Sequence, residues 1–169
     1  RDLNFQRRRQ RQMCIRDREK DGIKLKTTEH VLAALVGLEI DNVIIEIDAE
    51  EPPIMDGSSK YFVQALEKVG ILKQSKLRNE FVIKDIIHYS DDESGSEITL
   101  IPSDSYQVIT MVDYETKVLG TQNATLNDLK DFKTDFADAR TFSFLHEIEM
   151  LLENNLIKGG DLNLSLIHI

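Results

Sequence analysis

The stretch from Thr27 to Gly37 constrains the fold more than any other part of the sequence, because it carries a full set of helix signals. Either of its two leading threonines can cap a helix. Apolar residues follow at helical spacing, at Val31, Leu32 and Leu35. The closing glycine favours helix termination. We therefore predict a helix that runs to about Val36 and buries one apolar face against another layer.

The next residues predict a strand and then a second helix. Residues 42–49 alternate apolar and polar side chains, and Pro52-Pro53 ends that pattern because proline cannot donate to a sheet ladder. Asp56-Gly57 predicts a turn, and Ser58 can cap a helix that stops at Gly70. The side chains expected to point inward from this helix are Phe62, Ala65, Leu66 and Val69.

A polar stretch at residues 73–79 predicts a linker, and a second group of elements follows it. Apolar patterns at residues 81–88, 97–101 and 107–114, with an acidic turn at 91–95, predict an antiparallel meander. We also expect a helix at 127–132, an extended stretch at 140–142 and a helix at 144–154. Strands followed by helices, twice, indicate an α+β fold of two-layer sheet/helix sandwiches.

The composition excludes some classes of protein. Residues 1–18 carry seven Arg and two Asp, a local charge of +5, whereas the whole chain carries −9, so the remainder carries −14. That acidic remainder has no basic face with interleaved aromatic residues, which argues against a nucleic-acid binder. No apolar run approaches the ~20 residues of a membrane span. The single cysteine, Cys14, rules out a disulfide framework and favours a cytoplasmic protein.

The two ends of the chain are related at the level of DNA. Ser165–Ile169 can be encoded by TCT CTT ATA CAC ATC, and the opposite strand, read one base out of frame, encodes Met13–Arg16. One DNA adapter joined to both ends of a fragment would produce this pattern. We therefore expect residues 1–18 and 164–169 to be non-native sequence. The alternative is a native basic arm with an apolar tail.

The pair Glu29-His30 stands at the start of the first predicted helix. An acid beside an imidazole can place a base next to a metal ligand in a hydrolytic site, although most such pairs are a solvated acid beside a partly buried His. Four further segments follow it in order: Gly37–Asn42, Ile54–Ser58, Ala139–Phe142 and Gly159-Gly160. From about Lys24 to Leu162, this ordered set resembles the zinc-dependent UDP-3-O-acyl-N-acetylglucosamine deacetylases that act in the biosynthesis of lipid A, the lipid anchor of lipopolysaccharide.

The resemblance implies a fold and an activity. The fold would be two domains of the ribosomal-protein-S5-domain-2 type, both incomplete, with the active site between them. Residues 19–72 would be the latter part of the first domain, 73–79 the linker, and 80–163 the first part of the second. The activity would be a zinc-dependent hydrolysis that removes the N-acetyl group from UDP-3-O-acyl-N-acetylglucosamine, the committed step of lipid A biosynthesis.

The resemblance also implies roles for single residues. His30 would be a zinc ligand, Glu29 the general base, and Thr141 a hydrogen-bond donor to the tetrahedral oxyanion. Asp56 would shape its loop through an Asx-turn rather than act in catalysis. The residues matched to the passage for the acyl chain of the substrate are Phe142, Ile148, Ile157 and Leu162. The competing readings are a solvated acid for Glu29, a core or capping residue for His30, a helix-start residue for Thr141 and ordinary core for the four passage residues. For Asp56 the alternative is direct catalysis.

The family takes its other two zinc ligands from a His-Lys-x-x-x-Asp segment that has no counterpart here. We therefore expect an internal fragment that is inactive alone. Residues 113–122 resemble the form fused to a hydroxyacyl-carrier-protein dehydratase. Two competing hypotheses are a binding module on the same scaffold and a different metallohydrolase. The acyl-chain length, the oligomeric state and the presence of a dehydratase domain stay open.

Overall fold

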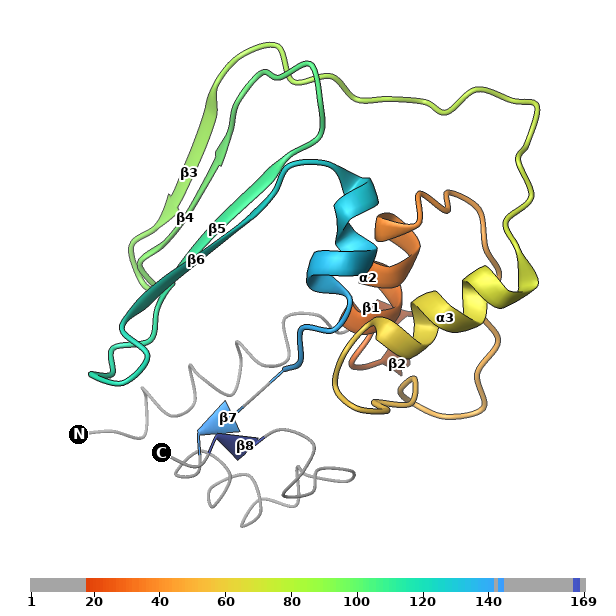
Figure 1. Ribbon diagram of the computed structural model, residues 1–169, viewed down its shortest axis with the longest axis horizontal. Coiled ribbons are helices and arrows are strands. Elements are labelled where there is room, and N and C mark those ends of the chain that lie inside the picture. The colour runs from red at the N-terminus through yellow and green to blue at the C-terminus, as the bar shows by residue number, and fades with distance from the viewer. Residues whose placement is uncertain (1–17, 142, 145–165, 168–169) are drawn as a thin grey trace. The chain divides into compact units, whose positions relative to one another are not determined.

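The computed structural model describes residues 18–141, 143–144 and 166–167. The chain divides into two compact units. The first runs to Ile71 and resumes at Phe132, and the second is Leu72–Asp131. The described elements combine helices with mainly antiparallel strands (Figure 1). The α+β class that the sequence predicts is therefore confirmed.

The first unit opens with a small hairpin in which β1 (Arg18–Lys20) pairs antiparallel with β2 (Ile23–Leu25). Asp21 and Gly22 form its turn with positive φ angles of 54° and 80°. Two-residue hairpin loops favour this backbone because it matches the twist of the strands. Our sequence analysis predicts no strand here, although the Asp-Gly dipeptide is a recognised hairpin signal.

Helix α2 (Glu29–Gly37) confirms the first predicted helix. Its N-cap residue is Thr28, whose side chain makes no capping hydrogen bond. The main-chain oxygen of Thr28 instead accepts the first helical hydrogen bond, from the amide of Leu32 at 3.1 Å. The burial pattern differs in part from the prediction, because Ala34 and Leu35 are buried whereas Leu32 is 37% exposed.

Helix α3 (Lys60–Val69) confirms the second predicted helix, which ends at Gly70 with a φ of 81°. The N-cap residue is Ser59, one residue later than predicted. The hydroxyl of Ser58 still accepts a hydrogen bond from the Lys60 amide at 3.2 Å. The predicted cap contact is therefore made from the neighbouring position.

The core of the first unit lies between α2, α3 and the segment that follows Phe132. Its members are Ala34, Val63 and Ala137, with Leu38, Phe62, Leu66 and Phe132 packed around them. The predicted inward set of α3 is wrong at two positions, since Ala65 and Val69 are exposed and Val63 is the buried residue. The residues of α3 that face the core are Phe62, Val63 and Leu66.

Gly37 is the point of closest approach in this unit. It lies at the end of α2, where a Cβ atom would overlap the aromatic ring of Phe132. The glycine is therefore required for space, because the ring lies against the helix backbone. The sequence predicts this glycine only as a helix terminator.

Residues 42–49 form no strand, so that prediction is wrong. Their apolar side chains are exposed, at Val43, Ile44, Ile45 and Ile47. A strand needs a neighbour to pair its N–H and C=O groups, and no other described segment pairs with this one. Alternation in the sequence cannot supply that neighbour.

The predicted helix at 127–132 is replaced by two turns, one tighter and one wider than an α-helix. A 3₁₀ turn (Leu129–Asp131) is followed by a π-helical turn (Phe132–Phe136). Asp128 accepts a hydrogen bond from the Lys130 amide at 2.9 Å, the contact that an N-cap residue makes at a helix start. The Ala137 amide then bonds to the Phe132 carbonyl at 2.8 Å, the i→i+5 bond of a π turn.

The second unit consists mainly of two antiparallel hairpins. Strand β3 (Ile87–Asp91) pairs with β4 (Ser96–Leu100), and β5 (Val108–Asp113) pairs with β6 (Thr121–Leu126). The predicted acidic turn joins β3 to β4. The single meander is wrong, because β4 and β5 lie in separate two-stranded sheets. Strand β6 is not predicted from the sequence, because its residues are mostly polar and lack the apolar pattern of a strand.

The first strand of this unit begins later than predicted, at Ile87 rather than Phe81. Ile87 pairs with Leu100, so any earlier residue would have to pair beyond the end of β4. Pro102 lies there and has no amide hydrogen to donate. The ladder therefore stops where its partner strand stops.

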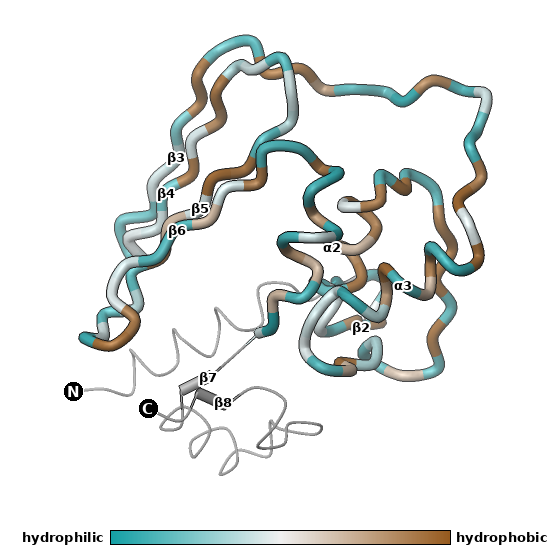
Figure 2. The backbone as a smooth tube through the Cα atoms, in the orientation of Figure 1, coloured by the Kyte–Doolittle hydropathy of each residue, from teal (hydrophilic) through white to brown (hydrophobic). Residues whose placement is uncertain are grey.

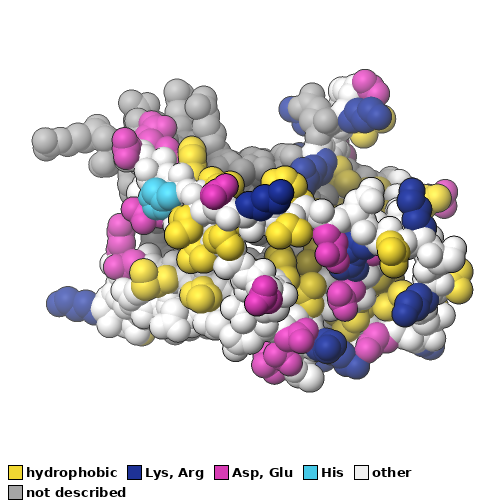
Figure 3. All heavy atoms as spheres, turned by 90° about the horizontal axis from the view of Figure 1, so that it is seen from above, with side chains coloured by type: hydrophobic (Ala, Val, Ile, Leu, Met, Phe, Trp, Pro, Cys, Tyr) yellow, Lys and Arg dark blue, Asp and Glu magenta, His cyan; other side chains and the backbone are white. Residues whose placement is uncertain are grey.

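Hydrophobic and hydrophilic residues alternate along these hairpins (Figure 2), yet both faces are largely open to solvent. Leu126 is the only buried residue of Leu72–Asp131, all of which the structure describes. The space-filling view shows hydrophobic side chains at the surface among acidic and basic ones (Figure 3). The hairpin side chains that are exposed include Ile87, Tyr89, Ile98, Ile109, Met111 and Val112.

A short parallel pair completes the described elements, with β7 (Ser143–Phe144) beside β8 (Leu166–Ile167). The extended stretch predicted at 140–142 lies just before β7, and Phe142 itself lies outside the described residues. The helix predicted at 144–154 also lies outside them, apart from Phe144. Within the described part of the chain, no helix has the length and apolar content that crossing a bilayer requires.

Candidate active site

Glu29 and His30 open helix α2, so both side chains extend from its first turn. Both residues are partly buried, and the Oε2 oxygen of Glu29 is shielded from solvent. An acidic side chain at this end of a helix interacts favourably with the positive end of the helix dipole. The local sequence thus places an acid and an imidazole side by side at a fixed helix terminus.

The backbone just before this pair is held in an uncommon conformation. Thr27 has a φ of 52°, which is rare for a residue branched at Cβ. Its hydroxyl donates to a carboxylate oxygen of Glu51 at 2.9 Å, and the Lys26 amide donates to the Glu50 carbonyl at 2.8 Å. These two bonds tie the entry of α2 to residues 50–51. Strain of this kind persists only where surrounding contacts hold it.

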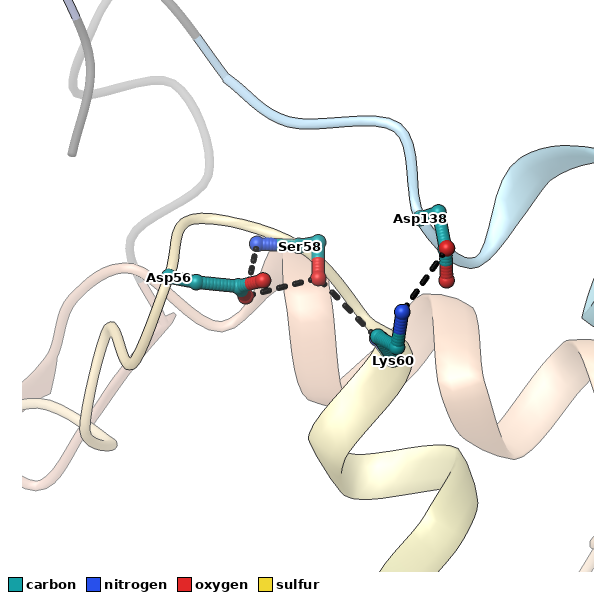
Figure 4. Close-up of polar contacts among 4 residues, drawn as sticks. All are labelled: Asp56, Ser58, Lys60 and Asp138. Carbon is teal, nitrogen blue, oxygen red and sulfur yellow. Dashed lines mark hydrogen bonds and ion pairs between the residues drawn. The ribbon is translucent and has the colours of Figure 1, made fainter. Parts of the chain in front are cut away.

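The turn at Asp56 is organised by hydrogen bonds from Ser58 (Figure 4). The Oδ1 oxygen of Asp56 accepts from the Ser58 amide at 3.1 Å and from the Ser58 hydroxyl at 2.7 Å. This is an Asx-turn, in which a side chain replaces a backbone acceptor. The preceding residue, Met55, has a φ of 52° and the following Gly57 has 79°, so the turn is tightly wound.

The same contacts change the acidity of Asp56. Partial burial raises the pKa of its carboxyl group, but the hydrogen bonds from Ser58 and the positive charge of Arg140 outweigh that effect. The pKa therefore lies below its usual value of 3.8. Asp56 is an ionised hydrogen-bond acceptor at neutral pH and holds the turn in that state.

Ser59 connects this turn to both neighbouring segments. Its hydroxyl donates to the main-chain oxygen of His30 at 3.0 Å, and its amide donates to the main-chain oxygen of Ala137 at 3.1 Å. The nearby Lys60 ammonium pairs with Asp138 at 2.9 Å (Figure 4). The start of α3 is thereby joined to the start of α2 and to residues 137–138.

Arg140 and Thr141 are bonded to the first two residues of the same turn. The Nε–H of Arg140 donates to the Asp56 carbonyl at 2.7 Å, and the Thr141 amide donates to the Gly57 carbonyl at 2.9 Å. Thr141 is exposed. The turn at 56–59 therefore links segments that are far apart in the sequence, one with Glu29 and His30 and one with Thr141.

Four sequence-predicted site residues thus belong to one small unit, namely Glu29, His30, Asp56 and Thr141. Those matched to the acyl passage, namely Phe142, Ile148, Ile157 and Leu162, lie outside the described residues. The sequence does not predict the links made by Ser59, by Arg140 and by the Thr27–Glu51 pair. The nearby signal is a serine at a helix start, which predicts a cap at Ser58 and no link from Ser59 to another helix.

The described residues do not form a complete metal centre. Across residues 18–141 and the two short described stretches beyond, no three His, Cys, Asp or Glu side chains lie close enough together to bind a metal ion. Catalytic zinc sites usually have three protein ligands. His30 alone therefore does not make up a zinc site in this part of the chain.

An acid, an imidazole and a hydroxyl held in one unit are the groups that hydrolytic enzymes use. Comparison with known proteins gives the family. The profile of the LpxC family, described as UDP-3-O-acyl N-acetylglycosamine deacetylase, matches residues 3–168. The chain belongs to this family, as its ordered motifs predict.

Curated relatives agree with this assignment. The chain is 44% identical over 149 residues to a "Bifunctional enzyme LpxC/FabZ" of Porphyromonas gingivalis, and 42% identical over 148 residues to one of Bacteroides thetaiotaomicron. Each alignment covers 88% of this chain and 32% of the relative. A "UDP-3-O-acyl-N-acetylglucosamine deacetylase" of Nitratidesulfovibrio vulgaris is 38% identical over 87% of this chain and 47% of its own length. The chain thus spans a third to a half of these relatives.

Proposed function

We propose that the longer protein containing this sequence is a zinc-dependent hydrolase that removes the N-acetyl group from UDP-3-O-acyl-N-acetylglucosamine in lipid A biosynthesis. One observation carries the proposal. In a chain of the deacetylase family, the turn at 56–59 is bonded both to His30, which follows Glu29 at the start of α2, and to Thr141. We propose that the reaction takes place in the cytoplasm.

The proposed roles follow from the chemistry of each group. His30 supplies one metal ligand, and the remaining ligands come from parts of the longer protein outside this sequence. Zinc, when bound, makes a water molecule acidic enough to lose its proton near neutral pH. Glu29 would accept that proton as the water oxygen attacks the amide carbonyl, and the amide C–N bond would then break to release acetate and the protonated amine of the sugar. Thr141 donates a hydrogen bond to the oxygen that becomes negative, a contact typically worth about 3–4 kcal/mol of barrier.

The substrate would be held by further residues of the chain. We propose that Phe142, Ile148, Ile157 and Leu162 contribute to the passage for its acyl chain. Asp56 takes no part in the chemistry under this proposal and acts by holding the turn. The hydrogen bonds of its carboxylate to Ser58 support that role.

Two substitutions in the full-length protein test the chemistry. Glu29→Gln should abolish most acetate release while zinc content stays near normal, because an amide keeps the shape but cannot accept a proton. The matched control is Glu46→Gln at an exposed acid, which should leave turnover unchanged. Full turnover in Glu29→Gln would remove Glu29 as the base.

His30→Ala should lower the zinc retained after dialysis, measured by metal analysis. The control is His88→Ala, at a histidine on β3 whose ring bonds Thr99 across the hairpin at 2.8 Å. Full zinc occupancy in His30→Ala would remove His30 from the ligand set. Loss of zinc in the His88 control would show that the measurement does not report on the site.

We further propose that the 169-residue chain is inactive by itself. Its described residues offer no group of three metal ligands, and a single imidazole does not hold zinc against water. Supplied with zinc and substrate, the chain should release no acetate above background. Release that a chelator abolishes would show that this chain builds a complete site.

The domain organisation is also a proposal. We propose that residues 19–72 and 80–163 are parts of two domains of the ribosomal-protein-S5-domain-2 type, joined by the linker at 73–79. Residues 1–18 and 164–169 would be non-native, although the family match runs from residue 3 to 168 and Leu166–Ile167 pairs with β7. A chain trimmed to residues 19–163 should keep its melting temperature. A clear drop would make these ends part of the native fold.

The longer protein is proposed to be of the bifunctional kind. The chain is 42–44% identical to three relatives named bifunctional LpxC/FabZ, and 38–40% identical to five named as the deacetylase alone. This order agrees with the resemblance noted at residues 113–122. The uninterrupted genomic reading frame tests the proposal, which fails if no dehydratase segment follows the deacetylase.

A further inference from the structure

Ser59 occupies the N-cap position of α3 but does not cap it. A serine at this position normally accepts a hydrogen bond from an amide in the first turn of its own helix. Here the Ser59 side chain makes no such bond, and Ser58 provides the acceptor for the Lys60 amide instead. The Ser59 hydroxyl is thereby available for a contact elsewhere.

That contact is the main-chain oxygen of His30, 29 residues earlier, at 3.0 Å. Ser59 is only 7% exposed, so the bond is protected from competing water. The same residue donates its amide to Ala137 at 3.1 Å. One buried serine therefore bonds both the helix turn that carries His30 and the segment that leads to Thr141.

We propose that Ser59 is a positioning residue for the reaction: its hydroxyl sets the placement of the first turn of α2, and so of Glu29 and His30, relative to the turn at 56–59. The inference rests on the proposed function. Ser59 itself touches no reacting atom, because its hydroxyl is committed to the His30 carbonyl.

The reason lies in the position of that carbonyl. Within α2 the His30 oxygen also faces the amide of Ala34, four residues on, so the helix itself survives loss of the serine contact. What is lost is the bond from the Ser59 hydroxyl, which joins this turn to the start of α3. A small displacement of an acid and a ligand from their reacting geometry lowers turnover strongly, whereas substrate affinity depends on other contacts.

The kinetic test uses the full-length protein with Ser59→Ala, Ser59→Thr and the control Ser90→Ala, at an exposed serine of β3. Ser59→Ala should lower kcat about tenfold or more and leave KM within about twofold. Ser59→Thr keeps a hydroxyl and should restore most of kcat. Ser90→Ala should match the wild type in both constants.

Three kinetic outcomes would overturn the inference: an unchanged kcat in Ser59→Ala, a change confined to KM, or an equal loss in Ser59→Thr with a lowered melting temperature. The last result would make Ser59 a packing residue.

If the wild-type protein releases no acetate, the proposed function fails, and the positioning role is then decided by hydrogen exchange on the 169-residue chain. Ser59→Ala should speed exchange in α2 and leave α3 unchanged, and equal rates in wild type and variant would refute it.

Discussion

The two units of this chain are stabilised in different ways. The first has a core of Ala34, Val63 and Ala137, drawn from segments far apart in the sequence, and hydrogen bonds that span 29 to 84 residues. The second is mainly ladders between neighbouring strands, and among its residues only Leu126 is buried. Four of the predicted site residues lie in the first unit, where distant segments are bonded to one another.

This difference shows what a site of this kind requires. A hairpin can fix its own turn with local bonds, as Asp91 and Ser94 do in the second unit. It cannot fix two segments that are distant in the sequence. The turn at 56–59 does so because its backbone and side chains bond outward as well as inward. The two units should therefore respond differently to substitution.

The largest effect is expected at Gly37. Gly37→Ala would stabilise an open helix by about 1 kcal/mol through helix propensity, but here the added methyl overlaps the Phe132 ring. We expect the free energy of unfolding of the first unit to fall by about 2–3 kcal/mol, measured by urea unfolding followed through the helical circular dichroism signal. A stabilised variant would show that the ring moves aside freely.

Gly95→Ala provides the comparison in the second unit. Nothing lies within 4 Å of a Cβ at Gly95, but its φ is 69°. The cost is therefore purely that of the left-handed backbone, about 1–2 kcal/mol. That loss should appear in the exchange of hairpin amides and not in the helical signal.

The next largest effect is expected at Val63, which is 2% exposed in the core. Val63→Ala removes two buried methyl groups and should lower the free energy of unfolding by about 2 kcal/mol. Val69→Ala is the matched control, because Val69 lies on the same helix but is 80% exposed. The control should be neutral or slightly stabilising. Equal losses in the two variants would mean that the core does not lie at Val63.

Helices α2 and α3 were predictable because their signals are local. The threonines and the glycine around α2, and Ser58 and Gly70 around α3, lie within or beside the elements that they delimit. The strand at 42–49 was not predictable in the same way. Its alternation is local, but a ladder partner is not, and no described segment provides one. Strand β6 is the converse, a polar segment that forms a strand because β5 pairs with it.

The site was predictable as a set of motifs and not as a network. Motif order led to Glu29, His30, Asp56 and Thr141 by resemblance to a family. The bonds of Ser59 to His30 and of Arg140 to Asp56 join positions 29 and 84 residues apart. No local rule links such positions, so only the three-dimensional structure reveals them.

A smaller effect is expected when the pH is lowered, and it should differ between the two units. In Asp56, burial raises the pKa, but the hydrogen bonds of Ser58 and the charge of Arg140 lower it more, so the pKa lies below 3.8. In Asp91, the hydrogen bonds from Ser94 lower the pKa by more than burial raises it, so this pKa also lies below 3.8. A lowered pKa contributes stability that is present above the unfolded value of about 3.9 and is lost as pH falls through the folded value. Each carboxylate thus protects its own unit at neutral pH.

Asp56→Asn should therefore flatten the acid limb of the helical unfolding signal, and Asp91→Asn should leave that limb unchanged. Nuclear magnetic resonance titration of the two carboxyl carbons gives the direct measurement, with both midpoints below 3.8. A normal midpoint for Asp56 would mean that the Asx-turn does not persist in solution.

The smallest effect is expected at the ion pair between Lys60 and Asp138, which joins positions 78 residues apart at 2.9 Å. Both side chains are more than a third exposed, and exposed pairs contribute little because water and salt screen them. The hydrogen bond and charge of Asp138 raise the pKa of Lys60 above 10.5. A raised lysine pKa gives stability that is complete below the unfolded pKa and is lost as the pH rises through the folded pKa.

Asp138→Asn should thus lower the melting temperature only slightly at neutral pH, and the difference in melting temperature from the wild type should close above the folded pKa or in high salt. A large gap that persists in salt would mean that Asp138 holds the segment before Thr141 by more than charge, and the long-range links of the first unit would then extend beyond the turn at 56–59.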